Sequence, residues 1–245
     1  MRLSLVVIAR NEADRIGRCL DSVPADHKLV LDAGSIDDTR EVARRHGAEV
    51  VAADWPGFVA QKNRGLDHAP GPWVVSLDAD EWLDATAAVA LRAAVDRDPV
   101  AGFGFVRQNR WLGRDLVAGR FAFERKVRVV LKGAGRWGGR EPHDQLDVSG
   151  PVGWLPGRLL HDPYRSFAEH LATARRYADL SAEALVAEGA RAGVWDVWGR
   201  PGWHLADALV VRGGWRDGWA GVAVAGVGAW STARKWRGVR ASGRR

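Results

Sequence analysis

The segment WVVSLDADEWLD, residues 73–84, decides the fold because it joins an apolar run to a cluster of acidic residues. A short apolar run bounded by polar residues is typical of a buried strand. Asp78, Asp80 and Glu81 follow within four positions, where their carboxylates repel one another. The segment therefore predicts one of two structures. Either a solvated acidic turn begins a helix at Glu81, or a cation binds at the end of the strand.

The chain before this segment alternates apolar runs with helical patterns. Further strands are expected at 3–9, 28–34 and 48–53, and helices after Asn11, from about Asp38, and over 60–69. Asn11 is a candidate cap of the first helix, and Asp38 with Glu41 resembles a capping box. Strands and helices that alternate with short loops favour an α/β fold with a doubly wound, mostly parallel sheet and helices on both faces.

Acidic residues fall where such a sheet binds its ligand, which is beyond the carboxyl ends of the strands. Asp32 ends the second expected strand, and Asp78 and Asp80 end the fourth. An alternative for Asp32 is an ordinary strand-to-helix turn, because LDAGSIDDT, residues 31–39, consists largely of turn-forming residues. The sequence leaves both interpretations of Asp32 open.

The second half of the chain has a weaker pattern. Strands are expected over 102–109 and 125–132 with a polar loop between them, and residues 140–150 are rich in turn formers. Ser166 and Glu169 form a second capping box, which predicts a helix with an apolar stripe that runs from Phe167 to Leu185.

Length and cysteine content set the broad class of the protein. A chain of 245 residues can bury a sizeable core in one large domain or in a domain with an extension. Cys19 is the single cysteine, which excludes an internal disulfide and fits a reducing compartment. The apolar run at residues 3–9 is too short for the core of a signal peptide, so we interpret it as a strand.

Positive charge is concentrated at the C-terminus. The chain has a formal net charge of +6, and residues 191–245 hold ten Lys and Arg against three Asp, together with seven of the thirteen tryptophans. This asymmetry predicts an anionic surface as partner. The uncharged stretch 218–233 is shorter than the roughly 20 residues that span a bilayer, so we expect docking at a membrane interface. The alternatives are a helix packed on the domain and, last, RNA binding.

The pair Asp78 and Asp80 has the chemistry of a magnesium or manganese site. These ions bind to one or two carboxylates and complete their shell with water and substrate phosphates. Such a cation stabilises the charge that develops on a departing diphosphate.

Four ordered motifs, SLVVIARNEADRIGRCLDSV (4–23), LVLDAGSIDDT (29–39), GFVAQKN (57–63) and VVSLDADEWLD (74–84), resemble family 2 inverting glycosyltransferases of GT-A fold. More narrowly, they resemble the β-1,4-glucosyltransferases of the lipopolysaccharide inner core. The resemblance continues through NRWLGR (109–114), PHDQLDVSGPVGWL (142–155) and LLHDPYRS (159–166). It implies a GT-A domain over 1–185 and a basic, Trp-rich helical extension over 186–245.

The resemblance also implies roles for residues at the matching positions. Those that would bind the UDP-sugar are the backbone around Ala9 and the side chains of Glu12, Asp32, Lys62, Asn63 and Asp78. Asp80 would bind the divalent cation, Mg²⁺ or Mn²⁺.

Asp144 occupies a position where relatives more often carry Glu, and it is the candidate general base. Inversion in one displacement requires a group that takes the proton of the acceptor hydroxyl. A turn-forming acid is the alternative for Asp144. His161 is a candidate metal ligand, because imidazole binds metals, although a lone His is more often only a hydrogen-bonded polar group.

The polar loop offers candidates for acceptor binding, with solvation of the loop as the alternative. An aromatic face suits a sugar ring and a guanidinium suits phosphate, which favours Arg110, Trp111 and Arg114.

These observations predict a cytoplasmic enzyme bound peripherally to the inner face of the cytoplasmic membrane. It would move a hexose, glucose first, from a UDP-sugar to a lipid-linked saccharide such as lipopolysaccharide core, without nucleic acid. The alternatives are transfer to polyprenyl phosphate, a nucleotidyltransferase, and a non-catalytic module that binds sugar or membrane. No glycine precedes Gly17, which disfavours the nucleotidyltransferase because its phosphate loop would be glycine-rich.

Overall fold

The computed structural model describes residues 2–96, 99–140 and 143–242. The chain folds into two compact units. The first consists of Met1–Arg107 and Glu124–His161, and the second of Gln108–Phe123 and Asp162–Arg245. The expected boundary at residue 185 is therefore misplaced: it falls inside a helix of the second unit, which also receives a segment from the middle of the chain.

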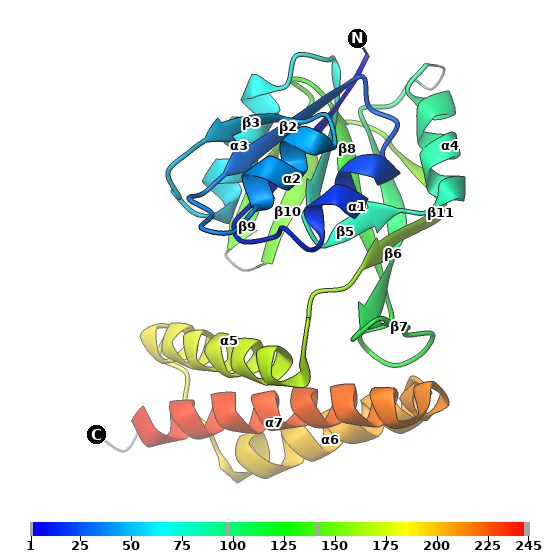
Figure 1. The fold of residues 1–245 in the computed structure, drawn as a ribbon. Helices are drawn as coiled ribbons and strands as arrows, with labels where there is room; N and C mark the ends of the chain where they lie inside the picture. The colour runs from blue at the N-terminus through cyan, green and yellow to red at the C-terminus, as the bar shows by residue number, and fades with distance from the viewer. Residues whose placement is uncertain (1, 97–98, 141–142, 243–245) are drawn as a thin grey trace. The chain divides into compact units, whose positions relative to one another are not determined.

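The main sheet begins with four parallel strands (Figure 1). They are β1 Leu3–Ala9, β2 His27–Asp32, β3 Glu49–Ala52 and β4 Trp73–Asp78, in the order β3-β2-β1-β4. β2 and β4 pair with opposite edges of β1, so the strand order reverses there, as in a doubly wound sheet. The expected fold class is confirmed in this part of the chain.

The other strands make the sheet mixed. β8 Phe123–Leu131 runs antiparallel to β4, and the sheet continues through β6 Gly102–Trp111, β11 Val152–His161 and β5 Glu81–Leu83. β7 Arg114–Asp115 pairs with the end of β6. A separate hairpin joins β9 Gly135–Arg140 to β10 His143–Val148. The turn-rich interpretation of 140–150 is therefore wrong, because described residues 143–148 form a strand.

Alternate residues of β1 face two different apolar cores. Leu3, Leu5 and Val7 pack with α1 Ile16–Ser22, α2 Thr39–Arg45 and α4 Ala85–Ala94. Val6 and Ile8 pack with α3 Phe58–His68 and the β9–β10 hairpin. The period of two along a strand explains this division, and it places helices on both faces of the sheet (Figure 1).

Three expected features of the helix starts are wrong. Asn11 has φ of 59° and α1 begins only at Ile16, so Asn11 does not cap it. Asp38 precedes α2 without a capping hydrogen bond from its side chain. Glu81 begins β5 and not a helix, and α4 begins after Asp84, whose carboxylate accepts from the amide of Ala87 at 2.7 Å.

The second unit contains the long helices α5 Phe167–Ala187 and α7 Gly218–Ser242, with α6 Arg200–Ala206 packed on α7 (Figure 1). π-helical turns at Trp195–Gly199 and Asp207–Val211 flank α6, and a 3₁₀ turn spans Gly214–Asp217. Ser166 caps α5 as expected, accepting from the Glu169 amide at 3.1 Å.

Small side chains form the inward faces of these helices. α5 buries His170, Ala178 and Ala182, whereas Phe167 of the expected stripe is 47% exposed. α7 buries mainly small residues, namely Ala220, Gly221, Ala225, Val227 and Val239. No helix in the described part of the chain is long and apolar enough to cross a membrane.

Candidate active site

The carboxyl ends of β2 and β4 bring the predicted acidic residues to one edge of the sheet. In the parallel registers, Asp32 lies opposite Ala9 and Asp78 lies opposite Ile8, on the two sides of β1. Two strand spacings separate the backbones of Asp32 and Asp78 by about 10 Å. The acids therefore lie at the point where the strand order reverses, which is the ligand-binding position of open α/β sheets.

Asp32 is a buried carboxylate with one unused oxygen. Its side chain is 1% exposed, and Oδ1 accepts from the Ser35 amide at 3.1 Å and lies 3.4 Å from Nε of Arg40. Oδ2 is buried and has no hydrogen-bond partner among the described residues. A buried acceptor without a donor is costly, so this oxygen is suited to a ligand that carries an N–H or O–H group.

The loops that follow β1 and β2 are tied together beside Asp32. The Asn11 amide donates to Oγ of Ser35 at 2.9 Å, and the Ile36 amide donates to Oδ1 of Asn11 at 2.9 Å. The left-handed backbone of Asn11 allows this exchange, and Asn tolerates that conformation better than most residues. The two loops therefore form one wall beside Asp32.

Ala9 and Glu12 lie along this wall. The carbonyl of Ala9 accepts from the Ala33 amide at 2.9 Å. The Glu12 amide donates to Oγ1 of Thr39 at 2.7 Å, and its carboxylate accepts from Nε of Arg15 at 3.0 Å. The structure therefore brings both predicted residues to the Asp32 side of the site, with the charge of Glu12 balanced by Arg15.

Asp80 also has one carboxylate oxygen that is buried and without a hydrogen-bond partner among the described residues. Its Oδ2 lies 3.6 Å from Nε2 of His161 and 4.0 Å from Nη1 of Arg15. Its Oδ1 is buried and accepts no hydrogen bond from the described part of the chain. Burial raises the pKa of Asp80, but its interaction with His161 and the charge of Arg15 outweigh burial and lower it. Asp80 therefore stays ionised beside the imidazole.

Lys62 joins the predicted general base to the end of β4. Its ammonium lies 2.8 Å from Oδ1 of Asp78 and 2.7 Å from Oδ2 of Asp144, and its side chain is 3% exposed. Burial lowers the pKa of this lysine, but the charges of the two carboxylates outweigh burial and raise it. α3, β4 and the β9–β10 hairpin thus meet at one buried cation, which holds Asp144 at the acidic edge.

The side chain of Asn63 contacts the backbone of the β9–β10 hairpin. Its side-chain amide donates to the carbonyl of Trp137 at 2.9 Å, and its Oδ1 accepts from the Trp137 amide at 2.9 Å. Both ends of the side chain are used to fix the β9–β10 hairpin to α3. The expected nucleotide contact of Asn63 stays a prediction, because each end of the amide makes one hydrogen bond here and can make another.

Sequence reasoning missed Glu81, Arg107 and Arg128 as members of the site. Glu81 is fully buried, and its carboxylate contacts Nε and Nη2 of Arg128, each at 2.8 Å, and Nη1 of Arg107 at 3.1 Å. Burial raises the pKa of Glu81, but the two arginines hold it well below its usual range. Arg128 also lies 3.5 Å from Asp78. The alternation of Lys126 and Arg128 with apolar residues in β8 indicated only that one face of this strand is polar.

The side chains at Asp80 fit a divalent cation that takes most of its ligands from water and substrate. Among the described residues, no group of three or more His, Cys, Asp or Glu side chains forms a complete metal cage. One orphaned carboxylate oxygen on Asp80 and the nearby His161 are instead a partial site. Magnesium and manganese accept such sites, because water and substrate phosphates complete their shells.

The candidate acceptor residues belong to the second unit. Arg110 donates to Oδ1 of Asp115 at 2.6 Å, and the guanidinium of Arg114 lies 5.1 Å from the ring centre of Trp219. Trp111 is 1% exposed, and its indole N–H donates to Nδ1 of His170 at 3.1 Å. The expectation that Trp111 stacks on a sugar is wrong, because its ring belongs to the core of the second unit.

Comparison with known proteins identifies the family. Residues 4–126, which are just over half of the chain, match the model described as glycosyl transferase family 2. The chain belongs to this family. The mixed sheet with flanking helices is the architecture that the resemblance to GT-A enzymes predicted.

Curated relatives match only part of their own length. A TPR repeat-containing protein of Synechococcus elongatus is 37% identical over 116 residues, which cover 46% of this chain and 29% of the relative. An uncharacterized glycosyltransferase of Mycobacterium bovis is 34% identical over 119 residues, or 48% of each chain. The chain thus spans less than half of the length of either relative.

Among solved structures, glucosyl-3-phosphoglycerate synthase from Mycobacterium tuberculosis, in complex with Mn²⁺, UDP and glucosyl-3-phosphoglycerate, is 25% identical. The match covers 45% of this chain and 44% of the synthase, with a TM-score of 0.36. A TM-score this low transfers no ligand from the synthase to this chain.

Proposed function

We propose that the protein is a metal-dependent inverting hexosyltransferase that uses a UDP-sugar, with UDP-glucose as the first candidate. One observation carries the proposal. Asp32 Oδ2 and Asp80 Oδ1 are both buried and both lack a partner in the described chain, on opposite sides of β1. A nucleoside diphosphate sugar has complementary groups, because a base or ribose donates hydrogen bonds at one end and the diphosphate attracts a cation at the other.

Each residue then has one task in donor binding. Asp32 accepts from the uracil imide or a ribose hydroxyl, inside the wall that Asn11 and Ser35 form. Asp80 and His161 hold the divalent cation, which when bound neutralises charge on the diphosphate. Lys62 fixes Asp78 toward the ribose or the donor sugar.

Asp144 is the proposed general base. Lys62 binds its Oδ2, and we assign Oδ1 to the hydroxyl of the acceptor. As the acceptor oxygen forms its bond to the anomeric carbon, its proton moves to Asp144 and the bond from that carbon to the diphosphate breaks, which releases UDP. This displacement inverts the anomeric configuration, and a positioned base typically accelerates such a step by about 10²–10⁴-fold.

Titration of UDP into the full-length chain, with and without MnCl₂, tests the donor site. We expect binding that manganese strengthens, a loss of about tenfold or more in Asp32→Asn, and a loss of the manganese effect in Asp80→Ala. Asp96→Asn is the matched control, because this acid pairs with Arg2 on the surface. Absence of UDP binding by the folded wild-type chain refutes the proposal.

The proposed acceptor is a lipid-linked saccharide, with lipopolysaccharide core as the first candidate. Its hydroxyl must lose a proton, so Asp144→Asn should lower kcat about 10²-fold or more while UDP affinity stays within about threefold. Polyprenyl phosphate is already an anion and needs no base. A rate that survives Asp144→Asn would therefore replace the saccharide acceptor with polyprenyl phosphate.

We also propose that the second unit docks on an anionic membrane surface at the inner face of the cytoplasmic membrane. Its exposed tryptophans support this proposal, since Trp195, Trp198, Trp203 and Trp215 are each at least 60% exposed. The segments that carry them bury only Val197 and Gly214 among their described residues, so these indoles are not part of the core. Tryptophan favours the bilayer interface, and basic residues are attracted to anionic headgroups.

Sedimentation with phosphatidylcholine vesicles, with and without phosphatidylglycerol, tests this surface. We expect binding that requires phosphatidylglycerol and falls at least tenfold when Trp195, Trp198 and Trp203 are replaced together by Ser. Trp55→Ser is the matched control, because Trp55 is 41% exposed but lies in the first unit. Equal vesicle binding by the triple variant and the control refutes membrane docking.

A further inference from the structure

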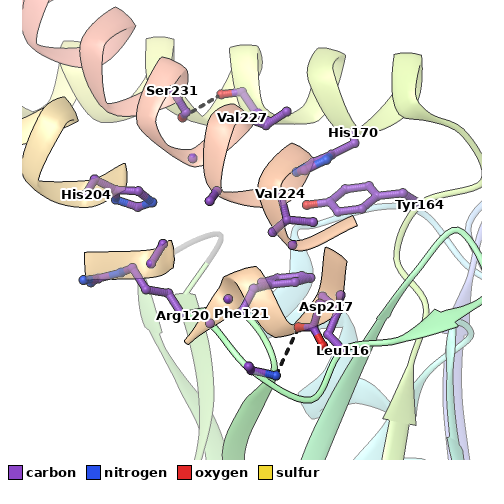
Figure 2. Close-up of a pocket in the computed structure, with 18 residues that line it drawn as sticks. Leu116, Arg120, Phe121, Tyr164, His170, His204, Asp217, Val224, Val227 and Ser231 are labelled. Carbon is purple, nitrogen blue, oxygen red and sulfur yellow. Dashed lines mark hydrogen bonds between the residues drawn. The ribbon is translucent and has the colours of Figure 1, made fainter. Parts of the chain in front are cut away.

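The second unit contains a cavity of about 220 Å³, partly open to solvent, that has no part in the donor site. The cavity lies between α7, α5, the turns around α6, and the loop 116–121 that the middle of the chain contributes (Figure 2). An apolar cavity of about 150 Å³ is enough to bind benzene. This cavity is larger, so it has room for a short hydrocarbon segment.

The cavity exists because small residues line it. Ala174 of α5, Ala208 and Ala225 contribute only methyl groups, while Val224 points into the space (Figure 2). Larger side chains at the same positions would fill this volume and improve dispersion contacts. The sequence instead leaves a space of defined shape between three helical segments.

Several polar groups of the wall are already paired within the protein. Asp217 accepts from the amides of Val117 and Ala118 at 2.9 and 3.1 Å. Ser231 donates to the carbonyl of Ala174 at 3.3 Å, and His170 accepts from Trp111. A polar ligand would have to break these bonds, whereas an apolar ligand leaves them intact. The interior of the cavity therefore favours a hydrocarbon.

One edge of the cavity carries the guanidinium of Arg120. Arg120 lines the cavity, and its guanidinium pairs with Asp207, which also accepts from Nε of Arg212 at 3.0 Å. Two guanidinium groups thus share the carboxylate of Asp207, while the carboxylate of Asp217, also in the lining, is bound by two backbone amides. The side chain of Arg120 is 44% exposed, so it can meet an anionic group that remains in water. Apolar space beside a cation is complementary to an amphiphile with an anionic head.

We infer that this cavity binds the hydrocarbon chain of a lipid whose headgroup is a phosphate, with the phosphate at Arg120. Two sources have this chemistry: an acyl chain of a membrane phospholipid, and the prenyl chain of a lipid-linked acceptor. The second source rests on the proposed function, because it would bring the acceptor to the enzyme. Binding of the chain itself does not depend on glycosyl transfer.

Calorimetric titration of the full-length chain with monomeric dodecyl phosphate and farnesyl phosphate tests the inference. We expect both probes to bind and inorganic phosphate not to bind. Val224→Phe should weaken binding at least tenfold because its ring fills the cavity. Val222→Phe is the matched control, since it makes the same change two positions earlier, where the side chain is 51% exposed, and it should change affinity less than twofold.

The headgroup and the source of the chain are tested separately. Arg120→Met should weaken both phosphate probes about fivefold and leave the affinity for farnesol unchanged. Farnesyl phosphate bound at least tenfold tighter than dodecyl phosphate would identify a prenyl lipid, and similar affinities would identify a phospholipid. Both results support the inference.

Binding that is absent in the folded wild-type chain, or equal in the two Val variants, overturns the inference. If Val224→Phe fails to fold, as judged by circular dichroism, Ala174→Leu replaces it and should weaken binding in the same way. UDP titration of the same variants separates the two proposals. Lipid binding without UDP binding refutes the proposed function alone, and UDP binding without lipid binding refutes the cavity alone.

Discussion

Replacement of Lys62 by Met removes the cation that joins the proposed base to the sheet. The ammonium contacts Asp78 at 2.8 Å and Asp144 at 2.7 Å, and methionine keeps a similar length of apolar side chain. Asp78 retains Arg128 at 3.5 Å, whereas Oδ2 of Asp144 loses its hydrogen-bonded ion pair. We therefore expect most of the cost to fall on Asp144.

The size of the effect follows from the exposure of the three side chains. Loss of one member of a buried ion pair typically costs about 3–5 kcal/mol, because the remaining charge stays buried without compensation. Lys62 is 3% exposed, but Asp144 is 13% and Asp78 is 30% exposed, so water partly replaces the ammonium. We expect Lys62→Met to lower the free energy of unfolding by about 3 kcal/mol. Adding Asp144→Asn should restore about 2 kcal/mol, since it removes the stranded charge.

Urea unfolding at pH 7, followed by near-UV circular dichroism, measures these differences. Lys28→Met is the control, because Lys28 lies 3.7 Å from Asp21 and its side chain is 19% exposed. We expect the control to cost no more than about 1 kcal/mol. If Lys62→Met lowers the free energy of unfolding as little as the control does, or if adding Asp144→Asn lowers it further, the contact of Lys62 with Asp78 and Asp144 does not organise the site as described.

Three other changes test packing and protonation. Burial lowers the pKa of His170 to about 4, so the ring that accepts from Trp111 stays neutral in the folded chain. The unfolded state therefore binds a proton at a higher pH than the folded state does. As the pH falls from about 6.5 to 4, the free energy of unfolding should drop by about 2 kcal/mol. The variant His170→Asn should not show this drop. Gly65→Ala should cost about 2 kcal/mol, because its Cβ would lie 2.3 Å from Cγ1 of Val6, and Val6→Ala should offset part of that loss. Gly226→Ala should stabilise the chain by about 0.5–1 kcal/mol, since the added methyl group meets no atom of the described chain within 4 Å. Thermal and urea unfolding measure the two glycine variants, and a stabilised Gly65→Ala or a destabilised Gly226→Ala would contradict the packing.

The sequence predicted the first four strands and the position of their terminal acids because both depend on local patterns. An apolar run that ends in Asp identifies the carboxyl end of a strand, and short connections between strands favour a parallel order. Asp32 and Asp78 follow from these two facts alone. Their proximity required only the rule that carboxyl ends of parallel strands share one edge.

The partners of those acids were not predictable in the same way. Arg128 reaches Glu81 because β8 lies antiparallel beside β4, a pairing between segments about fifty residues apart in sequence. Nothing in the local pattern of β8 distinguishes a buried arginine from an exposed one. The motif that contains Asn63 likewise did not indicate that its amide binds the backbone of Trp137.

The boundary between the units was missed for a related reason. Composition changes near residue 190, where basic residues and tryptophans begin to dominate, but composition reports the surface of a helix and not its packing partner. The helix α5 begins at Phe167 and packs along α7, so it belongs with the C-terminal residues. Trp111 joins them through His170, although it precedes α5 by more than fifty residues.

Ion pairs within the protein limit which carboxylate oxygens a metal cation can bind among Asp78, Asp80, Glu81 and Asp144. Asp78 and Asp144 share Lys62, and Glu81 is held by two arginines, so these three carboxylates contact cations at 3.1 Å or less, whereas Arg15 lies 4.0 Å from Asp80. Asp80 alone among these four has a buried oxygen without a partner in the described chain. One carboxylate oxygen binds magnesium or manganese weakly, and phosphate oxygens must supply further ligands. The cation and the nucleotide should therefore each bind weakly alone and tightly together, which makes the diphosphate part of the metal site.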